Sequence, residues 1–244
     1  MPIETFTARV DAIRNLTHDV RELDLRLVEP TAISFKPGQF ISFEMPHPQT
    51  GRSVTRAYSI ASSSGRGDVI TLLFNLVSGG PGSGFLFDLT VGDKVHFKGP
   101  AGNFYLREDP GRELLFIATG TGIAPIRSMI LANAQHSDPR PATLFWGLRS
   151  QQDLYYQDEW AELSRHAPNF TALTTLSRPE PGWSGETGRV LRLLDERVAS
   201  VDHLAVYVCG SSTMIADVIA RLQAKGPCPI YREKWYDDKG SSQE

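Results

Sequence analysis

One stretch decides the fold of this 244-residue chain: Phe116-Ile117-Ala118-Thr119-Gly120-Thr121-Gly122-Ile123-Ala124-Pro125. A strand-length apolar run leads into two glycines and then into a helix-forming segment with Pro125 in its first turn, where a missing N–H costs nothing. Glycines let the backbone approach a pyrophosphate, and the start of a helix offers it free N–H groups and a positive dipole. A tight strand–helix turn without a ligand has the same pattern, so the motif alone leaves both interpretations open.

Strands and helices alternate from this stretch onward. Strands are expected at residues 113–118, 142–147, 170–176, 203–209 and 229–235, and helices at 123–132, 154–166, 190–198 and 214–224. Alternating elements of this length predict a parallel sheet with right-handed crossovers, which is a Rossmann-like α/β domain. Ligands of such a sheet bind at the carboxyl ends of its strands.

The residues before this stretch predict β structure. Residues 20–27 alternate apolar and polar side chains, as in a half-buried strand, whereas residues 69–77 are apolar on both faces. About six such runs, separated by Pro, Gly, Asn and Ser, predict a small antiparallel Greek-key β-barrel. A polar linker separates the two patterns, so we expect a barrel domain over 1–108, an α/β domain over 109–236 and a polar tail over 237–244.

Composition argues against several classes of protein. The net charge of −3 argues against a nucleic-acid binder, which usually carries a basic stripe. No apolar run reaches the ~18 residues of a membrane-spanning helix, and Met1-Pro2-Ile3-Glu4 lacks the features of a signal peptide. Cys209 and Cys228 are too few for an iron–sulfur cluster, which needs about four thiolates, and no metal site is expected. Redox chemistry would therefore need a bound organic cofactor, and we expect a reducing, cytoplasmic setting.

Two further motifs fall in the barrel half. In Arg56-Ala57-Tyr58-Ser59, strand alternation places Arg56 and Tyr58 on one side and Ala57 and Ser59 on the other. A plain strand with exposed side chains fits this motif as well. The run Gly79-Gly80-Pro81-Gly82-Ser83-Gly84 indicates an anion cradle of backbone N–H groups, or else a flexible hairpin loop.

The motifs follow a fixed order along the chain. They are Arg56-x-Tyr58-Ser59, Gly82-Ser83, Gly120-Thr121-Gly122-x-x-Pro125, Cys209-Gly210 and Glu233-x-Trp235. In this order they resemble the ferredoxin–NADP(+) reductase superfamily over nearly the whole chain, and residues 35–40 and 99–104 resemble its barrel landmarks. Each motif is weak alone, but five in register over 180 residues leave little room for coincidence.

The resemblance implies one flavin, FAD rather than FMN, in the cleft between the two domains. Its contacts would come from Arg56, Ala57, Tyr58, Ser59, Gly82, Ser83 and Trp235. Arg56 would pair with the flavin phosphate, a charge-assisted contact worth about 1.5–3 kcal/mol. Tyr58 would pack on one face of the isoalloxazine ring, and Ser59 would hydrogen-bond near N5, the hydride-accepting atom.

The resemblance also implies a nicotinamide dinucleotide in the second domain. Its contacts would come from Gly120, Thr121, Gly122, Pro125, Arg149, Ser177, Arg178, Cys209 and Gly210. Cys209 would border the nicotinamide, although a buried cysteine that ends an apolar strand is usually a small hydrophobe. Arg149, Ser177 and Arg178 favour NADPH through its 2′-phosphate. However, Arg149 followed by Asp153 also fits NADH-using oxygenase reductases, unless Asp153 simply caps its helix.

The C-terminal residues have two interpretations each. Trp235 would cover the other face of the flavin and would have to be displaced by the nicotinamide. Nine residues follow Trp235, so a sheet-edge tryptophan with a polar tail is the alternative. Glu233 would relay protons together with Ser59, or else it pairs on the surface with Lys234 or Arg232.

The implied activity is flavin-dependent electron transfer by a monomer. Hydride would pass from NADPH or NADH to flavin N5, and electrons would leave singly for a ferredoxin or flavodoxin, with Ser59, Cys209 and Glu233 as catalytic residues. One alternative is a reductase of free flavin or quinone. Another is a reductase subunit of an oxygenase or of a larger redox complex.

Overall fold

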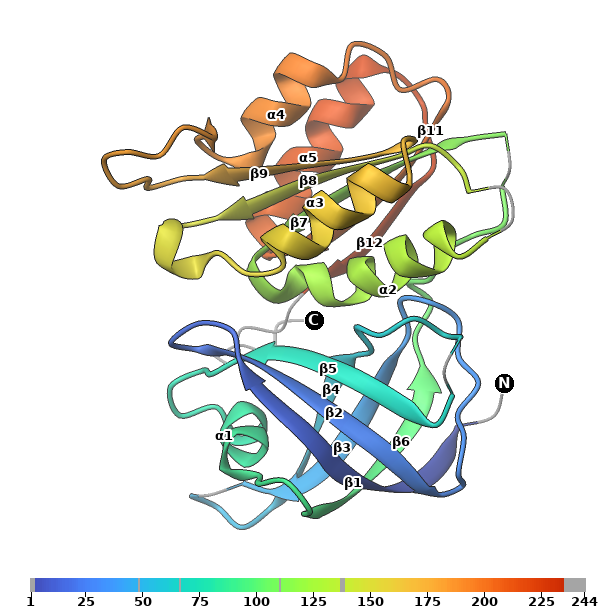
Figure 1. The fold of residues 1–244 in the computed structure, drawn as a ribbon, viewed down its shortest axis with the longest axis vertical. Coiled ribbons are helices and arrows are strands. Elements are labelled where there is room, and N and C mark those ends of the chain that lie inside the picture. The colour runs from blue at the N-terminus through green and yellow to red at the C-terminus, as the bar shows by residue number, and fades with distance from the viewer. Residues whose placement is uncertain (1–2, 48, 66, 110, 137–138, 235–244) are drawn as a thin grey trace.

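The computed structural model describes residues 3–47, 49–65, 67–109, 111–136 and 139–234. These residues form two six-stranded sheets, one before and one after the polar linker (Figure 1). The predicted two-part architecture, an antiparallel barrel followed by a parallel α/β sheet, is confirmed.

The first sheet is antiparallel and curls on itself. Its strands are β1 (Glu4–Asn15), β2 (Val20–Glu29), β3 (Phe40–Pro46), β4 (Ser53–Ser59), β5 (Val69–Asn75) and β6 (Lys94–Ala101). They pair in the order β4-β3-β6-β1-β2-β5, and a bridge between Ile60 and Leu72 brings the two end strands together. The inward-facing side chains of alternate residues, such as Leu23, Phe43 and Phe97, fill the interior.

One helix, α1 (Pro81–Asp88), follows β5. It begins within the glycine-rich run that the sequence left open between an anion cradle and a flexible loop. Pro81 occupies its first turn, where the ring fixes a helical φ at no hydrogen-bond cost. The segment is therefore a helix start and not a flexible hairpin.

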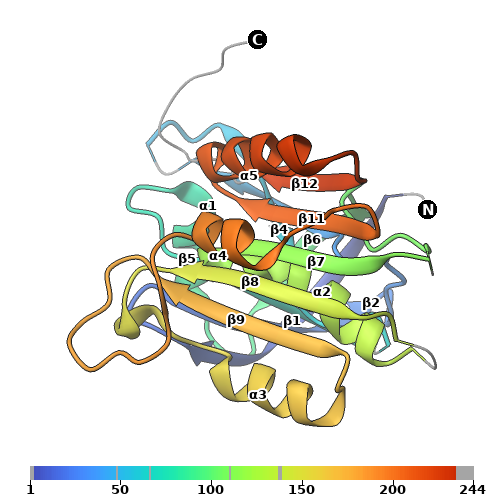
Figure 2. The same ribbon diagram turned by 90° about the horizontal axis from the view of Figure 1, so that it is seen from above.

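The second sheet is parallel throughout. Its strands are β7 (Glu113–Thr119), β8 (Ala142–Leu148), β9 (Phe170–Leu176), β10 (Glu186–Thr187), β11 (Leu204–Gly210) and β12 (Ile230–Lys234), in the order β10-β9-β8-β7-β11-β12. The helices are α2 (Ile123–Ala134), α3 (Gln157–His166), α4 (Val190–Arg197) and α5 (Ser212–Lys225). Helices α2 and α3 cover the face turned towards the barrel, and α4 and α5 cover the opposite face (Figures 1 and 2).

One predicted helix starts three residues later than expected. The apolar spacing placed its beginning at residue 154, but Gln151–Asp153 form a separate 3-10 turn and α3 starts at Gln157. Tyr156 explains the break, because its φ of 56° lies in the left-handed region, which cannot continue a right-handed helix. The short strand β10 was not predicted, since two residues carry no periodicity.

The two sheets share one hydrophobic cluster. Val20, Ala61 and Leu73 from the barrel pack with the buried residues under α2 and α3, among them Phe116 and Trp146. Hydrogen bonds add to this contact, because Arg127 and Ser128 of α2 donate to the carbonyls of Ala61 and Ser62 at 2.8 Å and 2.7 Å. The cleft between the sheets is therefore bordered by packed elements on both sides. No helix of the described residues is long and apolar enough to cross a membrane.

Candidate active site

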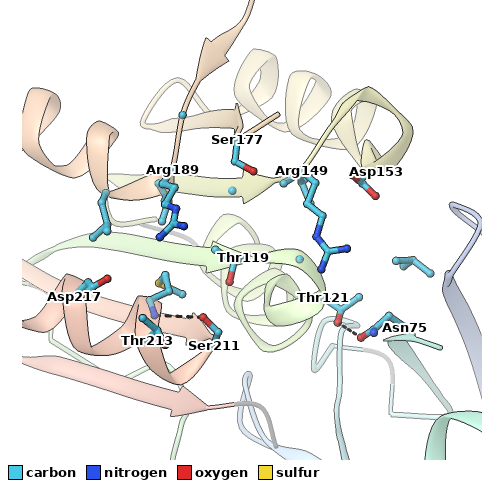
Figure 3. Close-up of a pocket in the computed structure, with 18 of the residues that line it drawn as sticks. Asn75, Thr119, Thr121, Arg149, Asp153, Ser177, Arg189, Ser211, Thr213 and Asp217 are labelled. Carbon is cyan, nitrogen blue, oxygen red and sulfur yellow. Dashed lines mark hydrogen bonds between the residues drawn. The ribbon is translucent and has the colours of Figure 1, made fainter. Parts of the chain in front are cut away.

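A cavity of about 610 Å³ lies at the carboxyl ends of the parallel strands (Figure 3). Thr119, Leu148, Ser177 and Ser211 line it from the ends of four neighbouring strands, and Asp19, Val20 and Asn75 line it from the barrel. Its volume falls in the ordinary range for ligand and cofactor sites, about 300–1,000 Å³. The cavity therefore lies where a parallel sheet is expected to bind its ligand.

The glycine turn after β7 forms one wall of this cavity. Gly120 adopts a φ of 52°, a left-handed conformation that favours glycine, and starts the 3-10 turn that leads into α2. Its carbonyl accepts a hydrogen bond from the buried indole of Trp146 at 3.0 Å. Thr121 donates to Asn75 of the barrel at 3.0 Å, so the turn is fixed from both halves of the molecule.

The predicted dinucleotide residues divide into two groups. Gly120, Thr121, Arg149 and Ser177 line the cavity, whereas Gly122, Pro125, Arg178, Cys209 and Gly210 are not among its lining residues. Gly210 acts indirectly: a Cβ at this position would lie 2.3 Å from Thr119 Oγ1, so only glycine lets β11 approach the end of β7. Cys209 is 2% exposed and pairs in register with Ala118 and Glu233.

Two arginines face the outer part of the cavity. Arg149 follows β8, and Arg189, which was not predicted from the sequence, precedes α4. In Figure 3 their side chains extend into the cavity on either side of Ser177, and the Arg149 guanidinium ends near Thr121. Arg178 is exposed and contributes only its backbone, which donates to the Arg149 carbonyl at 2.7 Å. The only sequence signal for Arg189 was its position immediately before an amphipathic helix.

Asp153 has the structural role that the sequence left open. Its Oδ2 accepts from the Ser150 backbone at 2.9 Å and from Ser150 Oγ at 3.0 Å, which completes a capping box around the 3-10 turn. Asp153 also lines the cavity. Asp217, on the first half of α5, is the acidic residue at the opposite side (Figure 3).

On the barrel side, Arg56 and Tyr58 lie against the start of α1. A Cβ on Gly82 would lie 2.5 Å from Tyr58 Oη and 2.8 Å from Arg56 Cγ, so both side chains touch this turn. The N-cap residue Gly80 provides no side-chain cap. The Arg56 guanidinium itself donates from Nη1 to the Thr55 carbonyl at 3.0 Å. An arginine whose stem packs against a helix N-terminus that no side chain caps fits the phosphate groups of a flavin nucleotide.

The side chain of Ser83 is turned away from such a ligand. Its Oγ accepts from the Val77 backbone at 3.0 Å and is buried, so only the backbone of Ser83 faces the helix start. The ring of Tyr58 is held edge-on between Phe43 and Phe74, with centroids 6.0 Å and 5.7 Å away. Ala57 points to the exposed side of the strand, as the alternation predicted.

The two halves meet at Ser59 and Glu233. Ser59 Oγ donates to Glu233 Oε2 at 3.3 Å, across 174 residues of sequence. Burial raises the pKa of the Glu233 carboxyl from its usual 4.5 to about 7, while the hydrogen bond from Ser59 lowers it. Trp235, the predicted flavin lid, lies outside the described residues, so its role stays a prediction.

Comparison with known proteins decides the family. Residues 7–105 match the model of the oxidoreductase FAD-binding domain, and residues 116–219 match that of the oxidoreductase NAD-binding domain. The chain is 35% identical over 238 residues to ferredoxin–NADP reductase B of Sorangium cellulosum, covering 94% of this chain and 95% of that protein. The chain belongs to the ferredoxin–NADP(+) reductase superfamily.

Other relatives of this superfamily member are longer. The reductase component DmpP of phenol 2-monooxygenase from Pseudomonas sp. is 34% identical over 228 residues, 91% of this chain and 62% of that protein. The crystal structure of the Amycolatopsis cytochrome P450 reductase GcoB superposes with a TM-score of 0.85 at 31% identity, covering 96% of this chain and 70% of that one. The chain thus spans about two thirds of the length of these oxygenase-type relatives.

One contact between the domains of this reductase-superfamily chain was not foreseen. The Tyr156 hydroxyl donates to Glu22 Oε2, and Glu22, which is 5% exposed, also accepts from Arg14. Arg127 lies 4.7 Å from the centre of the Tyr156 ring and pairs with Glu159 at 2.8 Å. Because buried charges need partners, this network fixes how α2 and α3 sit on the barrel.

Proposed function

We propose that the protein is an FAD-dependent oxidoreductase that takes hydride from NAD(P)H and passes electrons singly to a separate carrier protein. The observation that carries this proposal is the Ser59–Glu233 hydrogen bond. It lies where the phosphate-binding features of the barrel meet the sheet that carries the dinucleotide cavity. A flavin at this junction could contact both the barrel and the parallel sheet.

Each half contributes distinct groups. We assign Arg56 and the backbone of Gly82 and Ser83 to the flavin phosphates, and Tyr58 to one face of the isoalloxazine ring. The bound flavin supplies N5 as the hydride acceptor. Gly120 lets the backbone approach the dinucleotide, and its turn is held in place by Trp146.

Glu233 is assigned to proton storage at this junction. With a pKa raised to about 7, its carboxyl exists in both protonation states near neutral pH, which suits a group that gives and takes protons. Ser59 is placed to pass that proton on, because its hydroxyl both donates and accepts. Cys209, in register with Glu233 on the neighbouring strand, is assigned to the border of the nicotinamide.

NADPH is the proposed donor. Arg149 and Arg189 bring two cations to the cavity, and a 2′-phosphate would make charge-assisted bonds to them. Two such bonds favour NADPH by roughly 3 kcal/mol, a factor of ~100. Oδ2 of Asp153, the residue that favoured NADH, already accepts two hydrogen bonds from Ser150.

The proposed acceptor is a ferredoxin or a flavodoxin. The match along 95% of a ferredoxin–NADP reductase supports this proposal. The matches to reductase components of phenol and propane 2-monooxygenases support the second candidate, a reductase that serves an oxygenase. A stable complex with an oxygenase subunit, seen by size-exclusion chromatography of cell extract, would favour the second.

We also propose domain boundaries and a cellular setting for the protein. We propose that the flavin domain ends near residue 108 and that the nucleotide domain runs from 109 to 236. Neither Cys209 nor Cys228 forms a disulfide in the described part of the chain, which fits a reducing, cytoplasmic setting.

The test is anaerobic stopped-flow mixing of the purified flavoprotein with NADPH and with NADH. We expect both nucleotides to bleach the visible flavin band, NADPH at lower concentration. If neither bleaches it, the oxidoreductase proposal is wrong. Steady-state assays with a ferredoxin, free FMN and a quinone then rank the acceptors.

A further inference from the structure

One arginine at the interface of the two halves has partners that the proposed function does not use. Arg127 lies on α2, and its side chain is 15% exposed. Its Nη1 donates to the Ala61 carbonyl of the barrel at 2.8 Å. Its Nε and Nη2 lie 2.9 Å and 2.8 Å from the two carboxylate oxygens of Glu159 on α3. A single guanidinium therefore joins two helices of the parallel-sheet domain to the backbone of the barrel.

The backbone that Arg127 holds comes shortly after a proposed flavin contact. Ala61 lies two residues after Ser59 in the sequence. The Ala61 N–H donates to the Thr71 carbonyl of β5 at 2.8 Å, so this segment is fixed to the barrel. The hydrogen bond from Arg127 therefore acts on the part of the barrel that carries Ser59.

A second barrel contact reaches Arg127 through Tyr156. The Arg127 Cζ lies 4.7 Å from the centre of the Tyr156 ring, and the Tyr156 hydroxyl donates to Glu22 of β2. Tyr156, with its φ of 56°, is the only residue other than glycine that has a positive φ in the described part of the chain. A backbone in this conformation persists only where its surroundings hold it, and such residues cluster at functional sites. Arg127 and Glu22 together hold the Tyr156 side chain.

The Tyr156 corner also reaches the wall of the dinucleotide cavity. Its ring stands edge-on to Tyr155 at 5.2 Å, and the Tyr155 ring stands edge-on to Trp146 at 4.8 Å. Trp146 in turn donates to the Gly120 carbonyl at 3.0 Å, and Gly120 lines the cavity. Close-packed interiors have low compressibility and transmit displacements. The position of the glycine turn therefore depends on the position of Tyr156.

Hydride transfer makes a strict demand on the distance between the two halves. The two reacting atoms must approach to about 3–3.5 Å, and a misplacement of about 1 Å can lower the rate about 100-fold. In the proposed function, the barrel holds one of these atoms and the parallel sheet holds the other. We infer that Arg127 is a positioning residue for hydride transfer, because it sets how the flavin site on the barrel lies relative to the dinucleotide site on the sheet. This inference rests on the proposed function.

The experiment is anaerobic stopped-flow mixing of the FAD-loaded protein with NADPH at increasing concentrations, which separates the limiting rate constant of flavin bleaching from the Kd. Arg127→Met removes the hydrogen bonds and keeps an apolar stem. We expect its limiting rate constant to fall about 10- to 100-fold, whereas the Kd for NADPH and the Kd for FAD stay within twofold of wild type. Arg127→Lys keeps the charge and should recover part of the rate. Reoxidation of the dithionite-reduced protein by ferricyanide needs no nucleotide and should keep its rate.

Asn133→Ala is the matched control on the same helix. Asn133 is buried, and its side chain bonds the backbone of Arg140 at 2.9 Å and 3.2 Å, within the parallel-sheet domain. Its substitution should lower Tm and leave the limiting rate constant unchanged. Tyr156→Phe removes the contact with Glu22 and carries the test if Arg127→Met does not fold. We expect a fall of about 3- to 10-fold in its limiting rate constant, again with unchanged Kd values.

Two results would overturn the inference. One is a limiting rate constant within twofold of wild type in Arg127→Met, or in Tyr156→Phe if only that variant folds. The other is an equal fall in Asn133→Ala, which would assign the effect to lost stability. A wild-type protein that neither NADPH nor NADH bleaches would instead reject the proposed function, and this assignment with it. The wild-type measurement therefore separates the two failures.

Discussion

Replacing Glu233 with glutamine removes the charge at the junction of the two halves and keeps its shape. The amide oxygen of glutamine can still accept the hydrogen bond from Ser59. A carboxyl whose pKa is raised from 4.5 to about 7 pays about 3 kcal/mol for ionising in the folded protein. Because Glu233 is only partly buried, we expect about 1–3 kcal/mol of this to be measurable.

The sign of the effect sets the pH window. The folded protein holds the Glu233 proton more tightly than the unfolded chain does. The wild-type free energy of unfolding therefore falls as the pH rises from 4.5 to about 7. Titration of Glu233 does not raise it again above pH 7. Glutamine has no proton to lose, so the difference in stability between Glu233→Gln and wild type should widen in favour of the variant over this window.

Urea denaturation at pH values from 4.5 to 8.5 measures this difference. Glu44→Gln is the control, because Glu44 also accepts from a serine, Ser53 at 2.8 Å, but it is exposed and lies 3.4 Å from Lys98. These partners lower the pKa of Glu44, so its substitution should give no gain at high pH. A difference for Glu233→Gln that is independent of pH, or that favours wild type at pH 8.5, would contradict a raised pKa at Glu233.

Three further substitutions test other contacts of the site. Arg149→Ala should raise the Kd for NADPH about tenfold and that for NADH less than twofold in fluorescence titrations, and equal losses would contradict the 2′-phosphate assignment. Tyr156→Phe leaves buried Glu22 with one partner fewer and should lower the free energy of unfolding by about 1–2 kcal/mol in urea; unchanged stability would show that the network contributes little. Arg56→Ala should raise the Kd for FAD about 10- to 100-fold in titrations of the flavin-free protein, and retained affinity would remove Arg56 from the phosphate site.

Local patterns sufficed to predict most of the fold. The alternation in residues 20–27 and the strand–helix periodicity after residue 112 are set by which side chains face the core, and the structure places β2 and the parallel sheet accordingly. The start of α3 was wrong because apolar spacing cannot reveal a left-handed residue such as Tyr156. The choice between a loop and a helix at Pro81 also depended on packing against the barrel.

The site was only partly predictable for a related reason. Ser59 and Glu233 were named through the resemblance, and their contact follows from docking of the two sheets. The pairing of Glu22 with Tyr156 carries no local signal, because the domain interface brings the two residues together. Arg189 had only its position before an amphipathic helix as a signal, because a crossover brings it to the cavity. The side chain of Ser83 turned inward for a purely local reason, the need to bond the Val77 backbone.

Every assignment above depends on one flavin that binds between the barrel and the parallel sheet. Titration of the flavin-free protein with FAD and with FMN, followed by quenching of flavin fluorescence, tests it most directly. We expect saturation at one flavin per chain, tighter binding of FAD than of FMN, and a Kd for FAD raised about 10- to 100-fold in Arg56→Ala. A purified protein that is colourless and binds neither nucleotide would contradict it.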